Sequence, residues 1–174
     1  MNKILPELAD HLLAQSDSIL KEWLKAIQRS PDIASADRLD EANLVDHLPE
    51  LFENIAARLK DPSADGDFSD VSRAARRHGR FRWRQGYRLE EIISEASIIR
   101  RILFRNWLDS FASTFPEFDN ETRRMAEDVI HEAMDDVIAD SAEQYLEEQQ
   151  KSVIHLNSRL ADEVAELRQQ KDVR

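Results

Sequence analysis

Three ionisable side chains occupy positions that the helical pattern assigns to a buried face. In a predicted helix that ends near Gln85, His78 and Arg82 fall in the middle of the apolar face, counted at 100° per residue. Glu95 falls inside the apolar face of the helix that follows. Buried charges are tolerated when they are paired and hydrogen-bonded. We therefore predict a network of His78, Arg82 and Glu95 between two adjacent helices.

A turn at Gly86 is needed to bring these side chains together. Glycine readily adopts the left-handed conformation that ends many helices, so the chain can reverse after Gln85. The next helix restarts near Arg88, and its apolar positions are Ile92, Ala96, Ile99, Ile102 and Leu103. The stretch from residue 69 to 105 is thus expected to form two packed helices that hold the predicted network.

The residues needed for common enzyme chemistries are missing from the sequence. There is no cysteine, no Gly-rich phosphate loop and no Gly-x-Ser-x-Gly motif. Asp128 and His131 have the spacing of half of a carboxylate metal motif, but a second such pair and two further inward glutamates are not evident. We expect neither a catalytic site nor a bound metal in this fragment.

Composition favours an all-α fold with one core. The chain has 174 residues, of which 41% are hydrophobic, with only three glycines and five prolines. No segment alternates apolar and polar residues as a half-buried strand does. There is neither an apolar run of about 18 residues nor a signal peptide behind Lys3. We therefore expect a cytoplasmic protein without a membrane span.

Charge is distributed unevenly along the chain. The net charge is −11, yet residues 69 to 105 contain ten arginines and four acidic residues. An acidic protein repels nucleic-acid backbones, and no recognised nucleic-acid-binding motif accompanies the arginines. We expect these arginines to pair with the acidic remainder of the chain or with a partner subunit, and we expect no nucleic-acid partner.

The last third of the chain predicts one long helix. From Glu121 onward there is neither glycine nor proline, and a helix of about 50 residues would span about 75 Å. A domain of this size is only about 35 Å across, so the helix must leave it. Its second half has a narrow apolar seam formed by Val153, Leu156, Leu160, Val164 and Leu167. The seam predicts a parallel dimeric coiled coil over residues 151–174, after a domain over residues 1–150.

The order and spacing of several residues resemble a known family. They are His78, Arg82, Gly86, Tyr87, Leu89, Glu95 and Arg100. Together with residues 47–59, they resemble the RsbRD-type N-terminal domain, a globin-like sensor module without haem that is found in stressosome proteins and before bacterial histidine kinases. The resemblance covers roughly residues 5 to 150. It implies a globin-like helical bundle, and it adds Tyr87 and Arg100 to the candidate sensory network.

The resemblance also implies a function for the whole protein. We expect a cytoplasmic sensory and dimerisation domain that passes a packing change through the coiled-coil helix to an output domain in cis, beyond Arg174. A two-component sensor histidine kinase is the output that we favour. A stressosome co-antagonist of the RsbR type and a stand-alone oligomerisation or adaptor module remain alternatives, and other signalling proteins could be further partners.

A haem at His78 is the remaining alternative for the input. Histidine ligates haem in globins, and Trp83 with Tyr87 loosely resembles globin-coupled sensors. However, Arg82 lies one turn away on the same face and would place a cation beside the porphyrin. We therefore expect no cofactor at His78 and a hydrogen-bond network in its place, with haem or a small ligand left open.

Overall fold

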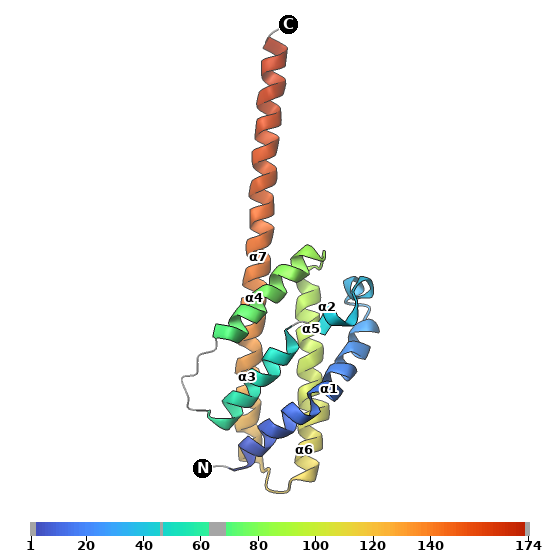
Figure 1. The fold of residues 1–174 in the computed structure, drawn as a ribbon, viewed down its shortest axis with the longest axis vertical. Helices are drawn as coiled ribbons and strands as arrows, with labels where there is room; N and C mark the ends of the chain where they lie inside the picture. The colour runs from blue at the N-terminus through green and yellow to red at the C-terminus, as the bar shows by residue number, and fades with distance from the viewer. Residues whose placement is uncertain (1–2, 46, 63–68, 173–174) are drawn as a thin grey trace.

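A computed structural model describes residues 3–45, 47–62 and 69–172, and these residues form helices and connecting turns without a strand (Figure 1). The elements are α1 (Ile4–Gln28), the 3₁₀-helix η1 (Ala34–Arg38), α2 (Glu41–Val45), α3 (Leu48–Lys60), α4 (Ser69–Arg84), α5 (Leu89–Ile102), the π-helix η2 (Leu103–Leu108), α6 (Asp109–Thr114) and α7 (Asn120–Asp172). The predicted all-α fold with a long C-terminal helix is confirmed.

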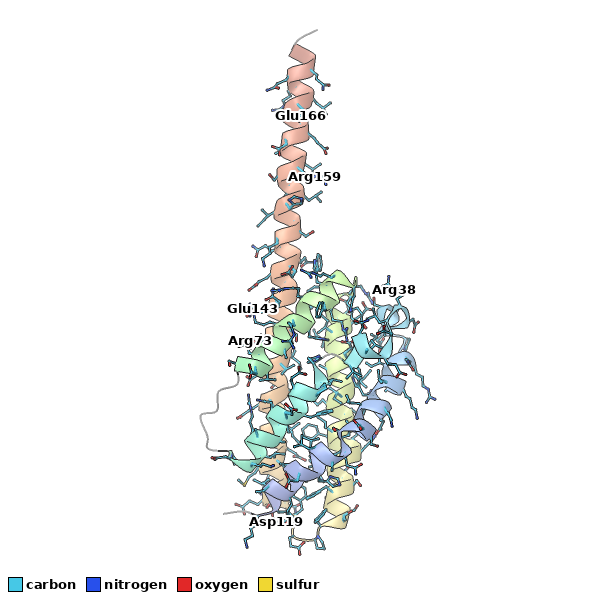
Figure 2. All side chains as sticks on the ribbon, viewed as in Figure 1. Arg38, Arg73, Asp119, Glu143, Arg159 and Glu166 are labelled. Carbon is cyan, nitrogen blue, oxygen red and sulfur yellow. The ribbon has the colours of Figure 1, made fainter. Side chains whose placement is uncertain are left out.

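Local sequence explains where the helices begin and end. Gly86 lies between α4 and α5 with a φ of 77°, the left-handed conformation that was predicted for it. Pro49 lies in the first turn of α3, where its missing N–H costs no hydrogen bond. The carboxylate of Asp119 caps α7, because it accepts a hydrogen bond of 2.8 Å from the Thr122 backbone N–H (Figure 2).

The helices pack in two layers around one apolar core. In Figure 1, α5 and α7 run upright beside each other, and α1, α3 and α4 cross over them. Trp23, Phe52 and Phe111 are fully buried in this core, as are Leu8 and Leu12 of α1 and Leu51 of α3. This arrangement places α4 against α7 and α3. The helix with the predicted histidine and arginine therefore touches the helix that leaves the bundle.

The segment after α5 differs from its sequence-based prediction. Residues 103 to 105, expected to end the second of the two packed helices, belong to a π-helix over residues 103 to 108, and Phe111 lies in helix α6. The π-helix buries Trp107, whose indole N–H donates a 2.9 Å hydrogen bond to Nδ1 of His11 on α1. Phe111 stacks on Phe115 with ring centroids 4.2 Å apart. The wider helical turn and this aromatic cluster thus fix the lower end of the bundle.

α7 continues far beyond the bundle as a single helix. Every side chain from residue 149 to 170 is exposed, and Figure 2 shows Arg159 and Glu166 on this projecting part. The predicted seam is exposed as well: Val153 52%, Leu156 56%, Leu160 50%, Val164 46% and Leu167 62%. The projection confirms that the helix leaves the domain. Its dimeric coiled coil and the domain boundary at residue 150 stay predictions.

Within the ranges that the structure describes, no helix is both long and apolar enough to span a membrane.

Candidate functional site

Arg82 is the best-anchored side chain of the site. Its guanidinium is completely buried and donates from Nε to the Glu95 carboxylate at 3.0 Å. Nη1 donates to the Asn43 carbonyl and to the Gln85 side chain, and Nη2 donates to the Leu44 carbonyl, each at 2.9 Å. Arg82 therefore joins α4 to α5 and to the end of α2. These four bonds satisfy most of the five donors of the guanidinium.

Glu95 faces two cationic or potentially cationic groups. His78 Nε2 lies 3.5 Å from the same carboxylate oxygen that Arg82 contacts, and both carboxylate partners are buried. Burial by itself would raise the pKa of Glu95, but contact with His78 and the charge of Arg82 outweigh it and lower that pKa. Glu95 is therefore held ionised inside the core. The structure brings His78, Arg82 and Glu95 together as the sequence pattern indicated.

Tyr87 closes the network on the side of the α4–α5 turn. The Arg82 guanidinium lies over its ring, 4.8 Å from the centroid, in a cation–π contact. Burial and the nearby Glu95 carboxylate raise the pKa of the Tyr87 hydroxyl, so it stays protonated. The Tyr87 carbonyl accepts a 2.8 Å hydrogen bond from the hydroxyl of Tyr145 on α7. Tyr87 thus connects the network to the long helix.

A second histidine belongs to the site, and sequence reasoning did not mark it. His47 precedes α3, and its ring lies against that of His78 with centroids 3.8 Å apart and an interplanar angle of 37°. Burial, reinforced by the neighbouring His78 and Arg82 side chains, holds the pKa of His47 well below its usual range. His47 is therefore a neutral imidazole beside an ionised pair. The one sequence signal for His47 was its position directly before a helix that has a proline in its first turn.

A small cavity adjoins the two histidines. Its volume is about 20 Å³, which is roughly the space that one water molecule needs. His47, His78, Glu95 and Ser141 supply its polar lining, and leucine, isoleucine, valine and methionine side chains from α3, α5 and α7 supply the rest. The cavity therefore links all four helices around the network, and it is far smaller than a porphyrin.

The structure places Arg100 apart from this network. Its guanidinium pairs with Asp135 of α7, and its side chain is 32% exposed. Arg100 lies more than one helical turn beyond Glu95 along α5, on the side of the helix that faces solvent and α7. Arg100 thus forms an ion pair away from the buried network, and its sensory role, which only the family resemblance implied, stays a prediction.

Directly next to His78, α4 and α7 touch backbone to backbone. A Cβ atom placed on Gly79 would lie 2.0 Å from the carbonyl oxygen of Ser141. Ser141 Oγ also donates a 2.9 Å hydrogen bond to the Ala75 carbonyl of α4. Only glycine allows this close approach. The residue after the network histidine is thus the contact point between the sensor helix and the projecting helix.

Ion pairs surround this contact point. Arg76 bonds Glu143 at 2.5 Å and Glu147 at 2.9 Å, and Arg80 lies 3.4 Å from Glu148. Figure 2 shows Glu143 at the height where α4 crosses α7. Arginines of the basic stretch thus pair with acids of the long helix, as the charge pattern indicated. Each exposed pair contributes little by itself, but together they fix which turn of α7 faces α4.

Glu91 is a second buried carboxylate, and it has a structural role. It accepts hydrogen bonds of 3.0 Å from both the backbone N–H and the hydroxyl of Ser35, and one of 2.7 Å from the Arg88 N–H. These bonds lower its pKa against the opposing effect of burial. Glu91 therefore caps α5 and holds η1 against it, at a distance from the histidine pair.

No group of three or more metal-binding side chains lies close enough together for a metal ion within the ranges 3–45, 47–62 and 69–172. His78, Arg82 and Glu95 are buried and contact one another inside the core. The arrangement is therefore suited to stabilising one packing of the helices. A ligand, a proton or a partner could shift that packing without any bond chemistry.

A helical bundle with a buried charge network and one projecting helix is typical of a sensory input domain. The family model of the RsbT co-antagonist protein rsbRD N-terminal domain matches residues 17–160, most of the chain. The chain belongs to this family, and it is a stressosome-type sensory and signalling N-terminal domain. No curated protein and no solved structure matches the chain.

Proposed function

We propose that this chain is the cytoplasmic sensory and dimerisation domain of a bacterial signalling protein, and that α7 carries its signal. One observation supports this most strongly. The helix α4 holds His78 and Arg82 of the buried network and, between them, Gly79, which contacts the α7 backbone. A change at the network therefore cannot move α4 without moving its contact with α7.

The path from the network to the output follows from rigid contacts. Loss or rearrangement of the Arg82–Glu95 bond would release α4 from α5, while the same guanidinium still bonds the Asn43 and Leu44 carbonyls of α2. The helix would then shift against Ser141 and against Glu143, which Arg76 binds. Packed helices have discrete arrangements, and such a shift is amplified along a continuous helix. α7 would rotate or slide as a unit.

We propose that the network acts without a cofactor and that this part of the protein has no enzymatic activity. The cavity beside His78 holds about 20 Å³, and the imidazole faces Glu95 and His47, which occupy the space that a haem would need. A haem would also lie beside the Arg82 charge, which is costly unless the charge is paired. The input is instead a small molecule, a proton or a contact that alters this pairing.

A two-component histidine kinase is the output that we favour, since a projecting helical seam suits a dimeric transmission rod. A stressosome co-antagonist is the second candidate, and the description of the matching family as an RsbT co-antagonist domain favours it. Both outputs need α7 to meet a second copy of itself. A stand-alone adaptor that offers the seam to another signalling protein is the third candidate.

Homodimerisation through the seam can be tested with matched substitutions. Leu156 and Leu160 lie on the seam and are 56% and 50% exposed, whereas Ile154 is 62% exposed but lies on another face. The double substitution Leu156→Glu/Leu160→Glu should raise the dissociation constant of the dimer at least about 100-fold. Each leucine would be buried in the dimer, and its loss removes about 2 kcal/mol of binding free energy in each chain. Sedimentation equilibrium provides the dissociation constants.

The control Ile154→Glu adds one negative charge per chain, half that of the double variant, at an exposed position beside the seam. It should leave the dissociation constant within about threefold of the native value, as expected for an exposed site. Equal weakening by both variants would mean that charge alone weakens association and would contradict a specific seam. An unchanged dimer in the double variant would place the interface entirely in the bundle.

A further inference from the structure

One hydrogen bond at the lower end of the bundle requires an unprotonated histidine nitrogen. The Trp107 indole N–H of η2 donates to Nδ1 of His11 on α1 at 2.9 Å. An indole nitrogen can only donate, so Nδ1 must offer its lone pair and the neutral ring carries its proton on Nε2. In an imidazolium both ring nitrogens are donors, and rotation of the ring supplies no acceptor. Protonation of His11 and this hydrogen bond therefore exclude each other.

The two partners of this bond differ in their access to solvent. The Trp107 side chain is 4% exposed, and a buried N–H that loses its acceptor is costly. His11 is only half-buried, so a proton from solvent can reach its ring. The accessible partner thus takes up the proton, and the buried partner loses its acceptor.

The same bond lies within a cluster of aromatic rings. His11 stacks on Trp107 with ring centroids 6.2 Å apart. It also meets Phe111 and Phe115 edge to face, at 5.2 Å and 6.4 Å. Phe111 in turn meets Phe118 at 5.3 Å, and Phe118 lies two residues before the first residue of α7. The cluster therefore connects α1 and η2 to the start of the long helix.

Two further hydrogen bonds join α1 to α5 and η2. The Trp23 indole N–H donates to the Glu95 backbone carbonyl at 3.2 Å, and the Asn106 side-chain amide donates to the Glu22 carboxylate. Both lie about three helical turns along α1 from His11. Loss of the His11 bond would therefore release the first turns of α1 from η2, while the later part of α1 stays attached (Figure 1).

Charged groups are present on the elements around His11. They are Glu7 on α1, Lys60 on α3, Arg105 on η2, Asp109 on α6, Glu117 after α6 and Arg123 on α7. Burial lowers the pKa of His11, and no charge of the described residues adds to this shift. The folded protein therefore takes up this proton at lower pH than an exposed histidine does. The bond is intact at about pH 7 and is lost as the pH falls.

We propose that the His11–Trp107 bond is an acid-sensitive latch, which holds the first turns of α1 against η2 while His11 is neutral and opens when His11 is protonated. The latch is separate from the buried network. The network contacts α7 near Ser141, whereas the latch reaches the start of α7 through the aromatic cluster. Acid would thus act on the long helix at a second point.

A titration of the full chain by NMR, from about pH 7.5 to about pH 5, tests the latch. The chain has three tryptophans, and Trp107→Phe assigns the Trp107 indole signal by its loss. As His11 is protonated, the Trp107 indole N–H should lose at least about tenfold of its protection from hydrogen exchange, because its acceptor is gone. Its midpoint should equal that of the His11 ring. The Trp23 indole N–H should keep its protection and serves as the internal reference.

His11→Asn is the matched variant. Its side-chain oxygen can accept the Trp107 hydrogen bond close to the position of Nδ1, and it does not titrate. Trp107 should therefore stay protected in this variant over the whole pH range. An equal loss of protection in His11→Asn would mean that another group, such as His47, causes it, and would overturn the latch. A His11 ring that stays neutral down to about pH 5 would overturn it as well.

Trp107→Phe gives an independent measurement. It keeps an aromatic ring but removes the N–H that opposes protonation, so His11 should titrate at higher pH than in the native chain. An unchanged His11 midpoint would show that the bond does not resist protonation, and would contradict the latch even if His11→Asn failed to fold.

Discussion

Replacing Glu95 by alanine is expected to lower the free energy of unfolding by about 3–5 kcal/mol, the cost of leaving a buried charge without its partner. Arg82 is completely buried, and within the described ranges Glu95 is the one anion that its guanidinium bonds, the other acceptors being neutral oxygens. Without the carboxylate, the guanidinium keeps bonds to neutral oxygens alone. Urea denaturation, followed by circular dichroism at pH 7, measures the loss.

Glu90→Ala on the same helix is the matched control. Glu90 is 64% exposed and pairs only with the equally exposed Arg88, so its loss should cost less than about 0.5 kcal/mol. A similarly small loss for Glu95→Ala would show that Arg82 finds other compensation and that the network does not hold the bundle. Replacement of both Arg82 and Glu95 by leucine should cost less than the sum of the single changes, because no charge is left unpaired.

Gly79→Ala is expected to destabilise the protein by about 3 kcal/mol, at the upper end of the usual cost of overpacking. The added methyl group would lie 2.0 Å from the Ser141 carbonyl oxygen, so α4 and α7 must move apart. In an unhindered helix the same change would stabilise by up to about 1 kcal/mol, because alanine has a better helix propensity. The sign of the effect therefore reports directly on the close contact. The same denaturation experiment measures it.

Arg84→Ala provides the reference value for an alanine on α4. Arg84 is exposed at the end of that helix, and its replacement should change stability by less than about 0.5 kcal/mol. A Gly79→Ala protein at least as stable as the native one would mean that α4 and α7 do not touch at this point. The proposed route from the network to the long helix would then lose its main contact.

Helical periodicity predicted the network because its members lie inside regular helices. His78 follows Ala74 and Ala75 on one helical face, and Arg82 lies one turn further along it. Glu95 lies among the isoleucines at positions 92, 98 and 99. This pattern depends on local sequence alone. The turn at Gly86 was also predicted from local sequence, because glycine readily adopts the left-handed conformation found there. The projecting helix followed from its length and from the lack of glycine and proline after Glu121.

Other parts of the site could not be predicted from local patterns. His47 joins the site from before α3, 31 positions away in sequence from His78, and it follows no helical stripe of its own. Its position depends on how α3 packs on α4. Arg100 shared the spacing of a family motif but pairs with Asp135, because the motif does not specify which side of α5 faces α7.

Helical periodicity also could not predict two features of the backbone. A π-helix has no recognised sequence pattern here, so the wide turn over residues 103 to 108 was missed. Gly79 did carry a signal, since a glycine inside a helical pattern lowers helix propensity and commonly has a packing reason. The partner backbone that required it lies 62 positions later at Ser141.

The coupling of the network to α7 can be measured directly, because the chain has no cysteine. Arg159→Cys introduces one spin-label site per copy, at an exposed position of α7 that flanks the seam. Double electron–electron resonance then measures the distance between the two labels in a dimer. Glu95→Gln removes the network charge while keeping the shape of the side chain, and Glu90→Gln makes the same change at an exposed site.

The account predicts that Glu95→Gln shifts the distance between the labels by on the order of 2 Å, the size of a typical helix shift in signalling proteins, while Glu90→Gln leaves it unchanged. The labels lie about five helical turns beyond Ser141, where α4 contacts α7. A shift that starts at this contact must therefore travel along α7. Identical distance distributions in both variants and in the native background would contradict the claim that the buried network sets the position of α7.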